Sequence, residues 1–253
     1  MNHRAALRGA RAAAVFLTSV PVGGFPFNRE EAAWASAWFP AVGTGIGVAL
    51  AAVWRLFAFL DPLPDALLTL TVGLLLTGAF HEDGLADTAD ALGGGVDRDH
   101  ALRILKDSRV GAYGAVALVA SFTVRGALLA SVPGLAASAL MASQCVSRLA
   151  PVWLLAALPY LTPESESKSR PVARAARAQV IVATLWTMGV LLTLAAAGLA
   201  TGVRLAGVAV MALAVTYGCG ALYRRRLGGI TGDLLGAAQQ VVEIGTLIVL
   251  AAR

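Results

Sequence analysis

The sequence predicts an all-α, polytopic membrane protein of about seven transmembrane helices, built as a single integral membrane domain over residues 1–253. Two observations predict this class. First, the chain is 58% hydrophobic and only 14% charged, whereas soluble domains average about 25% charged residues. Second, the apolar residues lie in long runs, and no hydrophilic stretch is long enough to form a soluble domain. These observations exclude a soluble globular protein and make the bilayer the expected solvent.

Several apolar runs approach the length of a membrane span, because a hydrocarbon core of about 30 Å needs roughly 20 apolar residues per helix. The predicted spans are Ala37–Leu60, Ala66–Phe80, Val110–Ser131, Leu135–Leu158, Val180–Ala200, Leu205–Leu222 and Leu234–Ala252. The second run is short, so we expect its polar end to lie within the protein rather than against lipid. Turn residues separate the runs at Asp61–Pro64, at Val132–Gly134 and at Thr201–Gly202.

The N-terminal segment carries three arginines before a short apolar stretch, Ala12–Val20. This arrangement is also found in signal peptides, but the following Pro21 and its neighbours offer no small-x-small cleavage site. We therefore expect an interfacial or short membrane-entering helix. The polar stretch Pro163–Arg170 is expected to be a solvated loop.

The basic residues set the expected orientation, because cytoplasmic loops carry an excess of arginine and lysine. With the N-terminus inside, the loops on that side hold most of the basic residues, and the opposite side keeps only Arg55, Arg204 and Arg253. The sequence thus predicts a cytoplasmic N-terminus. The net charge of +5 does not indicate nucleic-acid binding, because the basic residues lie between apolar runs rather than in patches interleaved with aromatics. Membrane lipid is the expected partner of this surface.

The most informative segment, His81–Asp90, directly follows the second apolar run and reads HEDGLADTAD. If the helix continues past Phe80, Asp83, Asp87 and Asp90 fall at positions i, i+4 and i+7 on one helical face. Like charges at this spacing repel one another, so three carboxylates require an external cation or a basic partner. Carboxylate oxygens suit Mg²⁺, which binds through a few carboxylates, waters and substrate phosphates. The alternative is a solvated acidic helix end.

A basic pair, Lys106 and Arg109, precedes the next run. Both residues would stand at the depth of the acidic segment, where a helix N-terminus also favours anions. Together they suit a diphosphate, and the alternative is a positively charged membrane anchor. His81 lies on the helical face opposite Asp83 and is either a general base or an interfacial histidine.

A glycine-rich segment opens the last run and is followed by polar residues along one helical face. Thr231 can cap this helix, and Gly232 lets backbone N–H groups approach a phosphate. Asp233, Gln240 and Glu243 recur at helical spacing, and Glu243 falls well inside the membrane. Ionisable residues at that depth are costly and indicate function.

Two arginines, Arg125 and Arg148, also fall in mid-span. Arg148 either forms a structural ion pair with Glu243 or faces a substrate cavity. A transporter would explain these charges too, but it predicts internal repeats, which the sequence lacks. A membrane prenyltransferase would also place an Asp-rich motif on a diphosphate, but such enzymes usually carry two motifs and this chain has one.

Three segments together resemble the cobalamin synthase family: the acidic segment His81–Asp90, the basic segment Lys106–Gly114 and the glycine-rich segment Gly229–Ala237. Phe16–Val22 is similar to the family's N-terminal signature, and the resemblance spans nearly the whole chain. It implies a multi-pass enzyme of the bacterial cytoplasmic (inner) membrane, with its active site facing the cytoplasm. The implied reaction joins adenosylcobinamide-GDP to α-ribazole or α-ribazole 5'-phosphate with Mg²⁺, giving adenosylcobalamin or its 5'-phosphate and GMP. The resemblance implies no nucleic-acid partner and leaves open whether the chain forms a homo-oligomer.

The resemblance also implies roles for individual residues. Asp83, Asp87 and Asp90 would hold Mg²⁺ against the diphosphate, and Glu82, where the family commonly has an apolar residue, adds a fourth carboxylate. Asp233 or a carboxylate of the acidic segment would accept the proton of the attacking hydroxyl. The residues expected to bind substrate are Lys106, Arg109, Thr231, Gly232, Arg148, Gln240 and Glu243. The acidic segment is similar to the site of CDP-alcohol phosphotransferases as well, but the rest of that motif is missing, which indicates shared chemistry rather than kinship.

Overall fold

The computed structural model describes residues 3–23, 29–95, 97–162 and 175–252, so the predicted loop Pro163–Arg170 lies outside the described residues. The described chain is helical without a β-strand, which confirms the all-α prediction. In chain order the helices are α1 (His3–Leu17), α2 (Arg29–Trp34), the 3₁₀ turn η1 (Ala35–Trp38), α3 (Phe39–Leu56), α4 (Pro62–Thr77), α5 (Phe80–Gly94), α6 (Arg98–Ile104), α7 (Ala112–Ser131), α8 (Ala136–Ser147), α9 (Leu149–Ala157), α10 (Arg177–Ala196), α11 (Gly202–Leu227) and α12 (Gly232–Ala251).

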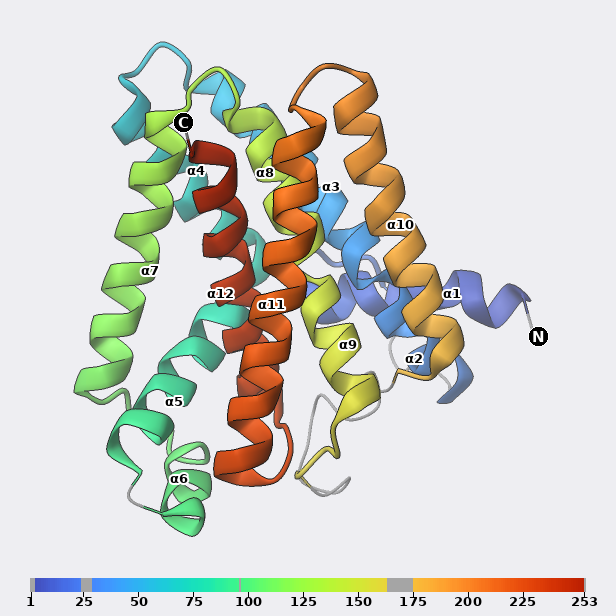
Figure 1. The fold of residues 1–253 in the computed structure, drawn as a ribbon, viewed down its shortest axis with the longest axis vertical. Coiled ribbons are helices and arrows are strands. Elements are labelled where there is room, and N and C mark those ends of the chain that lie inside the picture. Colours follow the sequence, from blue (N-terminus) through green and yellow to red (C-terminus); the bar gives the residue numbers. More distant parts are fainter. Residues whose placement is uncertain (1–2, 24–28, 96, 163–174, 253) are drawn as a thin grey trace.

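The long helices form a bundle around α12. Six helical segments of the described residues are long and apolar enough to cross a membrane, or seven if the bent pair of α4 and α5 counts as one span. This agrees with the predicted number of spans. Figure 1 shows α7, α10, α11 and α12 running along the length of the bundle, with α1 lying across it. Helix α12 packs against α5, α7, α8 and α11, so it forms the centre of the molecule. The cytoplasmic location of the N-terminus stays a prediction.

The second predicted span breaks in the middle of the bundle. Gly78 and Ala79 both adopt left-handed backbone conformations, with φ of 65° and 54°. The N–H groups of both residues bond the carbonyl of Leu74, which ends α4, as left-handed C-terminal caps do. A new helix then begins at Phe80, at an angle of 93° to α4. The helix of the second run therefore does not itself continue past Phe80, and the acidic segment lies on a new helix, α5.

The N-terminal signature stretch packs against this break. The backbone N–H of Ser19 donates a hydrogen bond of 2.8 Å to the carbonyl of Leu76, one of the carbonyls left free at the end of α4. The ring of Phe16 meets that of Phe80 edge to face, with centroids 5.0 Å apart. The segment that follows α1 thus fixes the direction in which α5 leaves the bend.

The predicted span Leu135–Leu158 is confirmed as one candidate span, Ala136–Ala157, whose helix is interrupted at Arg148 between α8 and α9. Pro151 lacks an N–H group, so it cannot donate to the carbonyl four residues earlier. The backbone N–H of Arg148 bonds Val146 rather than Gln144. Instead, the Arg148 guanidinium donates to the Gln144 carbonyl at 3.0 Å. The break therefore places an arginine in the interior and satisfies a carbonyl with its side chain.

Helices α3 and α8 approach closely through glycine. A Cβ atom built on Gly47 would lie 2.7 Å from the Cα of Met141 and 2.8 Å from the carbonyl oxygen of Leu140. Gly43, one turn earlier, would run into the Gln144 carbonyl in the same way. Small residues at this spacing let backbones come together where lipid supplies no hydrophobic driving force. Gly45 faces open space.

We expect Gly47→Ala to destabilise the bundle by about 1–3 kcal/mol, because the added methyl group must push α3 away from α8. Gly45→Ala, on the open face of the same helix, is the matched control and should leave stability unchanged or slightly raised. Thermal unfolding of the detergent-purified proteins, followed by far-UV circular dichroism, measures the difference. Equal unfolding temperatures would contradict the close packing of the two helices.

Candidate active site

The acidic helix α5 crosses the first turn of α12. A Cβ atom built on Gly84 would lie only 2.7 Å from the carbonyl oxygen of Asp233, so a side chain at this position would separate the helices. On the other side of the crossing, Gly236 lies against the backbone of His81. His81 itself is buried, with its ring against Phe80 and on the face opposite the acidic side chains. The crossing brings residues that are far apart in sequence to one place.

Three carboxylates gather at this crossing. Asp83 is exposed, and Asp87 and Asp233 are partly buried. Asp87 lies within electrostatic range of Asp83, Asp233 and Asp90, and Asp233 within range of Asp83. In the part of the chain that the structure describes, neither Asp83, Asp87 nor Asp233 has a basic side chain at ion-pair distance. Their mutual repulsion is therefore uncompensated by the protein, and a cation would relieve it.

Asp90, the last of the predicted metal ligands, holds the start of α7. One carboxylate oxygen accepts the N–H of Gly111 at 2.7 Å and the other accepts the N–H of Gly114 at 2.9 Å. A Cβ atom at either glycine would collide with this carboxylate. A negative charge beside the N-terminus of a helix is favourable. Asp90 thus joins α5 to α7, and the glycines of the basic segment are needed for that contact.

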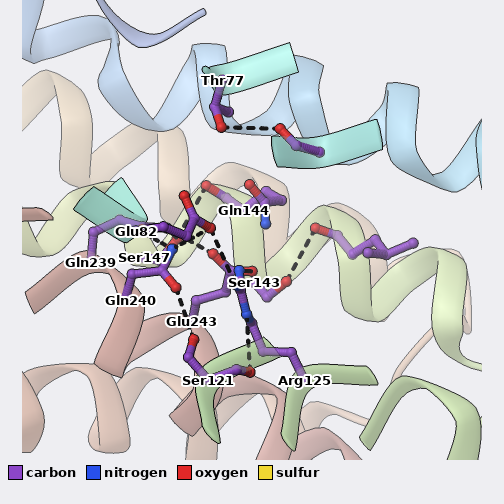
Figure 2. A network of polar contacts seen from close by, with 12 residues as sticks. Thr77, Glu82, Ser121, Arg125, Ser143, Gln144, Ser147, Gln239, Gln240 and Glu243 are labelled. Atoms are coloured by element: carbon purple, nitrogen blue, oxygen red, sulfur yellow. Dashed lines mark hydrogen bonds and ion pairs between the residues drawn. The ribbon is translucent and has the colours of Figure 1, made fainter. Parts of the chain in front are cut away.

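Glu82 belongs to a polar network in the interior of the bundle, shown in Figure 2. Arg125 on α7 bridges two carboxylates: it lies 3.1 Å from Glu82 of α5 and 3.1 Å from Glu243 of α12. Only 5% of the Arg125 side chain and 3% of the Glu243 side chain are exposed. Because such charges are very costly in isolation at this depth, each requires the other. Arg125 was noticed in the sequence as a mid-span charge, but its partners were not predicted.

Amide and hydroxyl groups complete the network. Gln240 donates to Glu82 at 3.1 Å and accepts from Ser121 at 3.1 Å. Gln239 donates to the second oxygen of Glu243 at 2.8 Å and to Ser147 at 2.8 Å. Sequence reasoning missed Ser121 and Ser147, because serines carry no distinctive signal within apolar runs.

Arg148 is fully buried near this network but does not form the suggested ion pair. It donates to the side-chain oxygen of Gln144 at 2.7 Å, whereas the Glu243 carboxylate accepts a hydrogen bond from Arg125. The pairing of Arg148 with Glu243 is therefore wrong, since helical position alone does not show which helices are neighbours. With the carboxylate of Glu82 included, two arginines and two glutamates balance in charge at the centre of the bundle.

The predicted basic pair lies at the surface. The Arg109 guanidinium donates to both carboxylate oxygens of Asp107, the shortest contact being 2.6 Å. Together with a bond from the Arg109 backbone N–H, this contact lowers the pKa of Asp107 to about 2. Lys106 is exposed in the same loop, between α6 and α7. In the described chain Arg109 is thus bonded to Asp107 rather than to the three carboxylates.

The predicted cap of α12 is confirmed. The Thr231 hydroxyl accepts the N–H of Leu234 at 3.4 Å and donates to Asp233 at 3.2 Å. Gly232 is the first residue of the helix. The preceding loop is pinned by a single parallel bridge between Tyr160 and Ile230. This cap and bridge hold the Asp233 carboxylate at the crossing with α5.

A groove of about 900 Å³ runs along α5 between α4 and α7. Glu82, Asp83 and Arg125 form its polar side. Its other walls are largely apolar and include Phe122 and the outward-facing Val119, which is 68% exposed. The groove therefore joins the acidic site to the lateral, membrane-facing surface of the bundle.

The donor set fits Mg²⁺ only in part. Among the described residues, no three His, Cys, Asp or Glu side chains are placed to hold a metal ion together. Asp90 is bonded through both oxygens to α7, and Glu82 through one oxygen to Arg125 and Gln240, which leaves Asp83, Asp87, Asp233 and the second oxygen of Glu82 as oxygen donors without a hydrogen-bonded basic partner. Mg²⁺ usually binds through one or two carboxylates and completes its shell with waters and substrate phosphates. A partial carboxylate site beside a large groove suits that mode.

Comparison with known proteins gives a consistent result over most of the chain. The family described as Cobalamin-5-phosphate synthase matches residues 9–251. An adenosylcobinamide-GDP ribazoletransferase of Polaromonas sp. is 39% identical, over 93% of each chain. Proteins of the same name from Rhizobium etli and Leptothrix cholodnii are 42% and 41% identical, covering 84% and 92% of this chain and 84% and 90% of their own. No solved structure matches significantly.

We expect Arg125→Gln to cost about 3–5 kcal/mol, because it leaves Glu82 and Glu243 buried without their ion-pair partner and leaves the network one positive charge short. The double variant Arg125→Gln/Glu243→Gln removes one of these charges and should recover part of the loss. Thermal unfolding of the purified single and double variants tests this coupling. If the double variant is simply less stable by the sum of the two single losses, the ion pair is not the source of the effect.

Proposed function

The chain belongs to the cobalamin-5-phosphate synthase family, and we propose that it is an adenosylcobinamide-GDP ribazoletransferase, the activity for which its relatives are named. It transfers the phosphocobinamide moiety of adenosylcobinamide-GDP to α-ribazole or α-ribazole 5'-phosphate. The products are adenosylcobalamin, or its 5'-phosphate, and GMP. The reaction belongs to the late steps of cobalamin biosynthesis.

One observation carries the assignment of the reaction to a site. Asp83 and Asp87 of α5 meet Asp233 of α12 beside a groove of about 900 Å³. A transfer between phosphoanhydride and hydroxyl requires neutralisation of phosphate charge and a proton acceptor, and little covalent chemistry from the protein. Uncompensated carboxylates at the side of a large groove supply both requirements.

Mg²⁺ is the proposed cofactor, and Asp83 and Asp87 would hold it together with waters and the substrate diphosphate. When bound with substrate, the ion would neutralise charge on the diphosphate and favour departure of GMP. This set differs from the sequence-based one, because Glu82 and Asp90 already serve the Arg125 network and the start of α7. Those two residues position α5, and through it the two carboxylates it carries.

The remaining residues bind and orient the substrates. Asp233, held by its bond from Thr231, accepts the proton of the attacking ribazole hydroxyl. The backbone N–H groups in the first turn of α12, from Gly232 onward, lie beside the Asp233 carboxylate and favour the binding of a phosphate. Lys106 and Arg109 contact the diphosphate when Arg109 exchanges Asp107 for substrate, which is feasible because this pair is exposed to solvent.

The proposed location is the bacterial cytoplasmic membrane, with the N-terminus and the acidic site facing the cytoplasm. Support comes from the excess of basic residues on that side of the predicted topology. The arginine-rich end of α11 and the start of α12 lie at the same end of the bundle. Nucleotide substrates reach this side of the membrane from the cytosol.

We expect Asp83→Asn, Asp87→Asn and Asp233→Asn each to lower turnover about 100-fold or more, because each removes a charge or a proton acceptor from the reacting groups. Asp99→Asn is the matched control, since this carboxylate is exposed on neighbouring helix α6. The assay supplies adenosylcobinamide-GDP and α-ribazole phosphate to reconstituted protein and measures GMP and cobalamin phosphate by chromatography. Undiminished turnover of Asp83→Asn would remove this residue from the site.

Metal removal provides a separate test. Treatment with EDTA should abolish turnover and added Mg²⁺ should restore it, and Asp87→Asn should need a higher Mg²⁺ concentration for half-maximal rate. Titration of activity with Mg²⁺ for the wild type, Asp87→Asn and Asp99→Asn measures this shift. Full activity in EDTA would refute the metal assignment while leaving the transferase activity in place.

A further inference from the structure

A second groove lies on the opposite flank of the bundle from the acidic groove, between α9 and α11. Its volume is about 510 Å³, and its lining is apolar along most of its length and basic at one end. Figure 1 shows α10 and α11 diverging below the turn that joins them, with α9 between them. The residues that line the groove are Trp153, Leu154, Ala157, Leu158, Leu213, Thr216, Tyr217, Gly220, Ala221, Arg224 and Arg225.

The apolar part of the groove faces outward. Leu213 is 55% exposed and Tyr217 80% exposed, in the middle of a helix long enough to cross a membrane. Gly220 leaves the floor of the groove open against Leu154 of α9. An exposed apolar surface on a membrane-spanning helix is covered by lipid acyl chains, and the groove offers one acyl chain a defined binding position.

The basic end of the groove consists of Arg224 and Arg225, in the last turn of α11. Arg224 donates to the Ala157 carbonyl at the end of α9 at 3.3 Å and so closes that end of the groove. Arg225 is exposed and forms no ion pair within the described residues. From Leu213 to Arg224 the helix rises about 16 Å, the distance from the interior of a leaflet to its phosphate layer.

We infer that this groove binds an anionic glycerophospholipid, with one acyl chain along Leu213, Tyr217 and Gly220 and its phosphate at Arg224 and Arg225. Basic pockets between transmembrane helices recognise anionic head groups, and guanidinium groups bind phosphate through paired hydrogen bonds. A zwitterionic lipid offers the same chains, but its cationic group would meet the two arginines. The charge of the groove therefore selects among lipids of equal apolar content. This site is separate from the acidic groove and does not depend on the proposed reaction.

The test compares two lipids with identical acyl chains, palmitoyl-oleoyl phosphatidylglycerol and palmitoyl-oleoyl phosphatidylcholine, by native mass spectrometry of the detergent-purified full chain. We expect the wild type to bind the anionic lipid about 25-fold more tightly, since each of the two arginines near an anionic head group contributes roughly fivefold. Arg224→Gln/Arg225→Gln should lower binding of the anionic lipid to the level of phosphatidylcholine. Arg224→Lys/Arg225→Lys should retain much of the preference.

Two controls separate the groove from general effects of charge. Arg103→Gln/Arg204→Gln removes the same charge elsewhere, from an exposed position on α6 and a partly buried one at the far end of α11, and should leave the preference intact. Ala221→Trp fills the exposed side of the groove and should weaken the binding of both lipids to the same extent. An unchanged preference in Arg224→Gln/Arg225→Gln would overturn the proposal. Equal competition by glycerol 3-phosphate alone would also overturn it, because the acyl chain would then contribute nothing.

Discussion

The need to neutralise charge away from water is the constraint on which the rest of the structure depends. Arg125 satisfies it by bonding Glu82 and Glu243 at once, and so it ties α7 to both α5 and α12. These contacts fix the rotation of α5 about its axis. Since Asp83 follows Glu82 directly, a helix turned to bring the glutamate to Arg125 also sets the position of the exposed aspartate, and both residues line the acidic groove. A structural and a reactive carboxylate are thus neighbours in the sequence and differ in their partners.

Hydropathy predicted where the helices lie, because each apolar run must satisfy its own backbone in lipid. It could not predict the break at Gly78 and Ala79, since the left-handed conformation of an alanine depends on the surrounding structure rather than on its own preference. Nor could the sequence identify the partner of Glu243: an ion pair with Arg148 was one of two alternatives for that arginine, and the partner is Arg125. Both arginines fall in mid-span, and only the packing of α7 against α12 decides between them.

The acidic motif was recognised as a cluster, but its members have different tasks. Helical spacing placed Asp83, Asp87 and Asp90 on one face, and they do lie on one helix. Spacing does not show that α7 begins beside Asp90 and takes up both of its oxygens through Gly111 and Gly114. Nor does it show that Asp233 arrives from α12 to join the other two. Glycine at position 84 makes that meeting possible, and its importance becomes visible only when both helices are in place.

The sideways opening of the acidic groove bears on why such chemistry takes place in a membrane. Val119 at its rim is an exposed apolar residue of a helix long enough to cross a membrane, and Asp83 is an exposed carboxylate in the same groove. A large molecule with one apolar and one ionic part can keep the apolar part in lipid and the ionic part in water while it enters the groove. The protein and such a molecule then meet by diffusion within the plane of the membrane. The rate of binding depends on the number of molecules per unit area of bilayer rather than on their bulk concentration.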